Sequence, residues 1–123
     1  MDSINYLLSI ETRGIKLGIE RTRDMMKACG NPHLGLPVIQ VAGTNGKGSV
    51  CSILASILKA AGYKTGLYTS PHLVRLNERI RINGQSIPDV EIDNFLQLYK
   101  QNIEEIKATF FETLTAMACW YFK

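Results

Sequence analysis

A glycine-rich stretch around one lysine is the part of this sequence best suited to chemistry. In "VIQVAGTNGKGSVCSILASIL", residues 38–58, an apolar run leads into glycines and then into apolar residues at helical spacing. Glycines let backbone N–H groups turn toward a ligand, and a helix N-terminus adds unpaired donors and partial positive charge. Lys47 opens this helix, and the hydroxyl of Ser49 follows it. A lysine and a hydroxyl serve the terminal phosphates and Mg²⁺ of a nucleotide, so the stretch predicts a phosphate site.

The stretch nevertheless departs from the general phosphate-loop pattern. The pattern G-x-x-x-x-G-K-[ST] requires a glycine where Val41 stands and a hydroxyl where Gly48 stands. Two interpretations follow: a nucleotide site with its own pattern, or a tight strand-to-helix turn that happens to be rich in glycine. The apolar run before the loop and the amphipathic run after it favour the nucleotide site.

The elements that must position this loop are predicted from hydrophobic periodicity. Val38–Ala42 is a short apolar run bounded by turn signals, which predicts a buried strand. Lys47–Ala61 is predicted as a helix that ends at Gly62, and Lys64–Thr69 as a second strand. Strand, helix and strand form a βαβ unit, which implies a parallel sheet. The predicted inner face of the helix consists of Val50, Ile53, Leu54, Ile57, Leu58 and Ala61.

The remaining chain is predicted to be mostly helical. Further helices are expected at Asp2–Ile10, at Ile19–Cys29, from about Asp89 to Lys107, and from about Phe110 onward. The segment "RIRINGQSI" predicts a β-hairpin turned at Asn83-Gly84. The expected class is therefore α/β, a P-loop-type parallel sheet with flanking helices.

Composition excludes several classes of protein. The 123 residues carry a formal net charge of +3 without a Lys/Arg run, which argues against a nucleic-acid partner but suits an anionic ligand. No apolar run is long enough for a membrane helix, and the N-terminus does not read as a signal peptide. Cys29, Cys51 and Cys119 lack metal-ligand and disulfide spacing, so buried free thiols and a cytoplasmic location are expected. The last residues, "TAMACWYFK", stop inside a helical pattern, which suggests a truncated chain.

Several motifs together resemble one enzyme family. "GTNGKGS", residues 43–49, resembles the phosphate loop of the Mur ligase superfamily. "YTSPHLVRLNERIRING", residues 68–84, is similar to a loop region of folylpolyglutamate synthase / dihydrofolate synthase, and residues 17–21 and 109–122 resemble that family too. Only 42 residues precede Gly43, which favours the folate branch over the muramyl ligases. The resemblance implies that residues 1–123 are the N-terminal part of the ATP-binding central domain, with the rest of that domain and a C-terminal domain absent.

The resemblance also implies a set of site residues. The ATP loop would comprise Thr44, Asn45, Gly46, Lys47, Gly48 and Ser49, with Lys47 as the catalytic residue. Ser70 would be a ligand of Mg²⁺. The pterin or folate substrate would lie against two segments, which consist of Ile15, Lys16, Leu17, Thr109, Phe110, Phe111 and Glu112.

Each assignment has a structural alternative. Ser70 and Pro71 can form an ordinary turn at a strand end, and at least one of the two phenylalanines is expected in the core. Glu112 can sit in the first turn of a helix, where the dipole favours a carboxylate. A solvated hairpin face is the preferred interpretation of Arg75, Arg79 and Arg81, and no role is assigned to His72.

The resemblance implies an ATP-dependent ligase that forms a C–N bond in folate biosynthesis and one-carbon metabolism. The ligase would add L-glutamate to dihydropteroate, to folyl-glutamate or to both, through an acyl phosphate, using ATP and Mg²⁺. The full-length enzyme is expected to be a cytoplasmic monomer that binds small molecules and neither nucleic acid nor membrane, and this chain alone is expected to be inactive. The alternatives are a non-catalytic ATP-binding module and another Mur-type amide ligase. A P-loop kinase or ATPase is disfavoured by Gly48 and by "TSPHLVRLNER".

Overall fold

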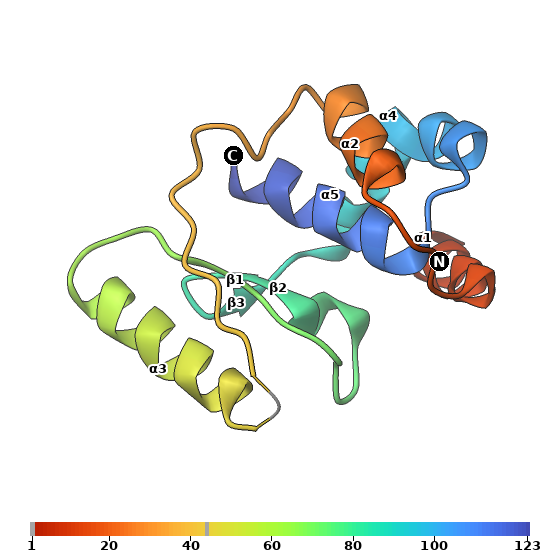
Figure 1. Ribbon diagram of the computed structural model, residues 1–123. Helices are drawn as coiled ribbons and strands as arrows, with labels where there is room; N and C mark the ends of the chain where they lie inside the picture. The colour runs from red at the N-terminus through yellow and green to blue at the C-terminus, as the bar shows by residue number, and fades with distance from the viewer. Residues whose placement is uncertain (1, 44) are drawn as a thin grey trace. The chain divides into compact units, whose positions relative to one another are not determined.

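The computed structural model describes residues 2–43 and 45–123, which form two compact units (Figure 1). The first, here called the helical unit, consists of Met1–Leu36 and Asp89–Lys123. The second, the hairpin unit, is the continuous segment Pro37–Pro88.

The helical unit brings together two helices from each end of the chain. α1 spans Asp2–Ile10, α2 Glu20–Ala28, α4 Asp89–Ile106 and α5 Phe110–Phe122, and a short 3₁₀ helix, η1, covers Glu11–Arg13. α2 packs against α4 and α5, and α1 packs against both of these as well. The four helices predicted for these parts of the sequence are confirmed, with bounds that differ by at most about two residues.

The core of the helical unit is apolar and aromatic. Phe95 on α4 packs edge-on against Trp120 on α5, with ring centroids 5.4 Å apart. Because both helices present apolar residues at helical spacing, their facing sides exclude water. The fully buried side chains of this unit include Leu7, Met25, Ile92, Ile103, Phe110, Leu114 and Met117.

The hairpin unit combines one long helix with a small sheet. α3 spans Lys47–Ala60, and the strands are β1, Gly66–Tyr68, β2, Ile80–Ile82, and β3, Gln85–Ser86. A 3₁₀ helix, η2, covers Leu76–Arg79. The strand order is β1-β2-β3 and both pairs are antiparallel, with Leu67 opposite Arg81 and Arg81 opposite Ser86.

Two turn predictions in this unit are confirmed. Asn83 and Gly84 both have positive φ, 51° and 83°, as the two-residue turn between β2 and β3 requires. Gly62, with φ of 94°, follows α3, and the N–H of Tyr63 donates to the carbonyl of Leu58 at 3.0 Å. This contact, together with Gly62 N–H to Lys59 O at 3.0 Å, is the glycine-terminated helix end that the sequence predicts.

The α/β class is confirmed, but the predicted parallel sheet is absent from the described residues. Val38–Ala42 was predicted to be a buried strand; the structure assigns no strand there, and Val38 and Ile39 are exposed. A β-strand exists only where a neighbouring strand supplies hydrogen-bond partners. Because no strand precedes α3 in the described residues, they contain no βαβ unit.

The missing parallel sheet also explains why the apolar face of α3 is not buried. Its predicted inner residues are all exposed or half-buried, and no residue of α3 is buried. A helix in a doubly wound fold buries its stripe against a parallel sheet. That sheet is not formed in the described residues. α3 therefore has the predicted apolar spacing, but its apolar side chains are not buried.

The three cysteines are free, and no described helix is both long and apolar enough to cross a bilayer. Cys29 is buried, whereas Cys51 and Cys119 are half-buried, so the expectation of buried thiols holds for one of them. Burial, reinforced by nearby Cys119, raises the pKa of Cys29 to about 11. A thiol with so high a pKa stays protonated and unreactive at neutral pH.

The first prediction concerns the start of α5. The hydroxyl of Thr109 accepts from the Glu112 N–H at 3.2 Å and caps this helix. Thr109→Val keeps the shape but loses the acceptor, so we expect a loss of about 1 kcal/mol in the free energy of unfolding, measured by urea titration. Thr115→Val is the control, because that hydroxyl donates to Phe111 O within the same helix. Equal losses in the two variants would contradict the capping role.

Candidate functional site

The glycine loop leads directly into the N-terminus of α3. Gly46 caps α3 with φ of 77°, and its carbonyl accepts from the Val50 N–H at 2.9 Å. The N–H groups of Lys47, Gly48 and Ser49 belong to the first turn, which has no carbonyls one turn earlier to bond. Being a glycine, the cap offers no side-chain acceptor, and the first turn holds no acidic residue.

These donors face solvent. Asn45, Lys47, Gly48 and Ser49 are all exposed. Thr44, the second residue of the predicted ATP loop, lies outside the described residues. The left-handed φ of Gly46 is easily adopted by glycine and disfavoured for other residues. The loop therefore presents donors of a helix N-terminus to an incoming anion.

The hairpin unit is strongly basic. It contains six Lys and Arg residues, whereas Glu78 is its one acidic residue, which gives a formal charge of +5. The helical unit carries the balance, −2, of the chain's +3. An anionic ligand is thus attracted to the unit that holds the glycine loop.

Ser70 lies two residues after the end of β1, exposed and immediately before Pro71. The segment that follows is organised by Glu78. Its carboxylate accepts from the backbone N–H groups of Leu73 (2.8 Å), Val74 (3.1 Å) and Arg75 (3.0 Å). These backbone donors, Arg75 foremost, lower the pKa of Glu78. An ionised Glu78 therefore shapes the loop beyond Ser70.

The arginines of this unit do not form the single solvated face that the sequence suggested. Arg79 is only 4% exposed, and its Nε donates to Nδ1 of His72 at 2.8 Å. Arg75 is exposed, and Arg81 is half-buried on β2. The prediction was wrong for Arg79 because the loop folds back over η2, which periodicity does not reveal.

The start of α5 is a reciprocal capping box. The Thr109 N–H donates to Oε1 of Glu112 at 2.9 Å, while the Glu112 N–H donates to Oγ1 of Thr109. Phe110 lies in the core, as expected for at least one of the two phenylalanines. Phe111 is 42% exposed and meets Phe110 edge-on at 5.5 Å. One aromatic ring therefore faces solvent beside a buried carboxylate.

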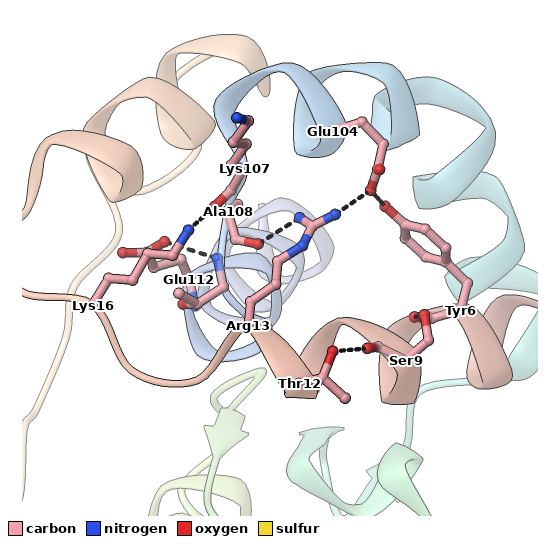
Figure 2. Close-up of polar contacts among 10 residues, drawn as sticks. Tyr6, Ser9, Thr12, Arg13, Lys16, Glu104, Lys107, Ala108 and Glu112 are labelled. Carbon is pink, nitrogen blue, oxygen red and sulfur yellow. Dashed lines mark hydrogen bonds and ion pairs between the residues drawn. The ribbon is translucent and has the colours of Figure 1, made fainter.

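The other predicted substrate segment lies against the turn that precedes α5. The side chains of Ile15 and Leu17 are almost fully exposed, and Lys16 Nζ donates to the carbonyl of Lys107 at 3.3 Å. Arg13 donates to the carbonyl of Ala108 at 2.9 Å and to Glu104 at 2.6 Å (Figure 2). The hydroxyl of Tyr6 donates to the same Glu104 carboxylate. Cationic side chains thus tether the loop after α1 to the α4–α5 turn.

Arg21 joins the two predicted substrate segments directly. Its Nε lies 3.1 and 3.2 Å from the two carboxylate oxygens of Glu112, and its Nη2 donates to the Leu17 carbonyl at 2.9 Å. Sequence reasoning assigned no role to Arg21, although it closes the motif "LGIER". A pairing across 91 positions leaves no trace in local periodicity, so only the fold shows it.

Comparison with known proteins gives a consistent relationship. No model of a protein family matches the chain. It is 42% identical over 121 residues to the dihydrofolate synthase/folylpolyglutamate synthase of Escherichia coli, an alignment that covers 98% of this chain and 28% of that protein. A probable bifunctional folylpolyglutamate synthase/dihydropteroate synthase of Haloferax volcanii is 39% identical, with 98% of this chain and 15% of that protein covered. The chain thus spans less than a third of the length of these relatives.

Solved structures agree with this relationship. Folylpolyglutamate synthase of Thermotoga maritima superposes with a TM-score of 0.90 at 36% identity, over 99% of this chain and 30% of that one. The structure described as Escherichia coli FolC in complex with DHPP and ADP gives 0.83 at 42% identity, over 98% and 29%. Relatedness across nearly all of the chain, in sequence and in structure, means that it belongs to the folylpolyglutamate synthase/dihydrofolate synthase family.

Proposed function

We propose that this chain supplies the nucleotide loop and the pterin-side surface of an ATP-dependent ligase that adds L-glutamate to dihydropteroate, to folyl-glutamate or to both. The observation that carries the proposal is the exposed glycine-capped start of α3, in a chain related over 98% of its length to a dihydrofolate synthase/folylpolyglutamate synthase. Residues 1–123 would belong to the ATP-binding domain of that enzyme.

The nucleotide part of the proposal rests on donors and charge. Three first-turn amides, the ammonium of Lys47 and the +5 charge of the hairpin unit suit the phosphates of ATP. Asn45, Gly46, Gly48 and Ser49 would line the same phosphates, and Thr44 would join them. One related solved structure is described as a complex with AMPPCP and folate.

The pterin part of the proposal rests on an exposed ring and a carboxylate. Phe111 offers its ring for stacking, and Ile15 and Leu17 add apolar surface. In the described residues Oε2 of Glu112 accepts one hydrogen bond, from Arg21, and so keeps capacity for a pterin N–H. Thr109 and Phe110 would act by holding the start of α5, since the first caps it and the second is buried.

The chemistry follows from joining a carboxylate to an amine. The γ-phosphoryl group of ATP passes to the carboxylate of dihydropteroate or of the terminal glutamate, which gives ADP and an acyl phosphate. The amine of L-glutamate attacks the acyl carbon, and phosphate leaves. Positioning and charge stabilisation dominate phosphoryl transfer, and Lys47 with the loop amides would supply both.

Mg²⁺ would enter with the nucleotide. The described residues contain no cluster of three or more His, Cys, Asp or Glu that could hold a metal, so they do not form a protein cage. The exposed hydroxyl of Ser70 does fit an ion that keeps phosphate and water as most of its ligands. The bound ion would neutralise phosphate charge.

The alternative function is a nucleotide-binding module without catalysis. The specific observation in its favour is that the chain spans only 15% to 28% of the relatives described above. Both functions require ATP binding, so a ligase assay separates them.

The ligase assay uses a segment exchange. We replace the 121 aligned residues of the Escherichia coli relative with this chain and supply ATP, Mg²⁺, dihydropteroate and labelled glutamate. We expect ATP-dependent incorporation of glutamate into dihydrofolate. Lys47→Ala should incorporate roughly 10²-fold less, because the negative charge on the transferred phosphoryl group would no longer be stabilised by a fixed cation. Lys59→Ala, at the far end of α3, is the control. A folded exchange protein without incorporation, beside an active parent, would leave only the binding module.

Substitutions at two glycines distinguish the effect of backbone strain on ATP binding from the effect of blocking the approach of the ligand. Gly46→Ala must adopt a positive φ, so we expect a cost of about 1–2 kcal/mol in stability and weaker ATP binding. Gly48 lies in α3 without a positive φ, and outside the adjoining helix backbone no described atom lies within 4 Å of the position that a Cβ would take, so Gly48→Ala should leave stability intact. We still expect it to weaken ATP binding, because a methyl group would obstruct the phosphate. Calorimetric titration and thermal unfolding of the chain measure both; unchanged ATP affinity in Gly48→Ala would contradict a phosphate at that amide.

Ser70→Ala tests the cation contact. We expect the Mg²⁺ concentration for half-maximal ATP binding to rise about tenfold, as for the loss of a contact that supports a metal. Ser86→Ala, also exposed and in the hairpin unit, should leave the Mg²⁺ titration unchanged. If both variants titrate like the original chain, Ser70 belongs to a simple strand-end turn.

A further inference from the structure

We propose that Arg21 is a positioning residue, which holds the segment Ile15–Leu17 in one arrangement against the N-terminus of α5. The inference deepens the proposed function, since it rests on these two segments forming the pterin-side surface. Arg21 itself need not touch the ligand.

One guanidinium makes both contacts. Its Nε reaches the two oxygens of Glu112 at 3.1 and 3.2 Å, while Nη2 reaches the Leu17 carbonyl at 2.9 Å. Arginine presents several donors in a rigid planar fork, so fixing one partner also fixes the direction of the other. The position of the Leu17 backbone is thereby fixed relative to the first turn of α5.

Packing does little to hold this segment. The side chains of Ile15 and Leu17 are 84% and 93% exposed, so they bury little apolar surface. The neighbouring tether from Lys16 to the Lys107 carbonyl is 3.3 Å long and exposed. Exposed contacts of long side chains contribute little. Of these two contacts that hold residues 15–17, the one from Arg21 is therefore better buried than the one from Lys16, since 22% of the Arg21 side chain is exposed.

The ion pair also governs Glu112. Its side chain is 9% exposed, and a carboxylate at that depth requires a compensating charge. Thr109 N–H bonds Oε1 alone, so Arg21 is the contact that orients Oε2. A loss of Arg21 thus disturbs both segments at once: it releases the Leu17 carbonyl and frees the carboxylate to turn.

The test replaces Arg21 by lysine in the chain itself. Lysine keeps the positive charge but carries all its N–H donors on one nitrogen, so it cannot reproduce the geometry in which Nε meets the Glu112 carboxylate and Nη2 meets the Leu17 carbonyl. Arg23→Lys is the matched control, because Arg23 lies exposed on the same helix. Three quantities are measured for each protein: the Kd of 7,8-dihydropteroate, the Kd of ATP, and backbone ¹⁵N order parameters of residues 15–18.

We expect Arg21→Lys to raise the Kd of dihydropteroate about tenfold, equivalent to about 1.4 kcal/mol of binding free energy, and to leave the Kd of ATP unchanged. The order parameters should fall from about 0.85, typical of ordered backbone, to below about 0.6. Arg23→Lys should match the original chain in all three. Unaltered order parameters in Arg21→Lys, or equal losses of ATP and dihydropteroate affinity, would overturn the positioning role. If the original chain binds no dihydropteroate, the proposed pterin surface fails, and the order parameters still decide whether Arg21 positions the segment.

Discussion

The buried carboxylate of Glu112 joins the two segments of the helical unit that we propose as the pterin-side surface. It closes the first turn of α5 through the Thr109 N–H and accepts the guanidinium of Arg21, which in turn bonds the Leu17 carbonyl. Segments 91 residues apart thus share one charge-assisted network. Such hydrogen bonds are stronger and more directional than neutral ones, so they specify geometry as well as stability.

The hairpin unit follows a different principle. The features proposed to meet a nucleotide are backbone donors, Lys47 and a net positive charge, and the described first turn of α3 contains no buried residue. A polyphosphate needs little more, because its charge is spread over many oxygens that accept from N–H groups. The single carboxylate of the unit, Glu78, accepts from three backbone N–H groups and offsets one of the six positive charges, which leaves a formal charge of +5.

The sequence correctly predicted those features that depend on interactions between residues close together in the chain. Helix spans, the Asn83-Gly84 turn and the glycine-terminated end of α3 were confirmed, because capping, positive φ and periodicity act within a few residues. The prediction of a strand at Val38–Ala42 was wrong, because a strand needs a neighbouring strand and no described segment pairs with these residues. Arg79 was wrong as a solvated residue, because its burial results from how the loop folds over η2.

The sequence by itself determined the family and the glycine loop, because those motifs are contiguous and chemically specific; the residues assigned to ATP and a pterin remain proposals. Only the tertiary structure decided which side chains meet: Arg21 with Glu112, Lys16 with Lys107, and Arg79 with His72. It also decided that Phe110 is core while Phe111 faces solvent. The physical reason is range, since propensity and capping are encoded over a few residues, whereas ion pairs and burial depend on positions that the chain brings together only when folded.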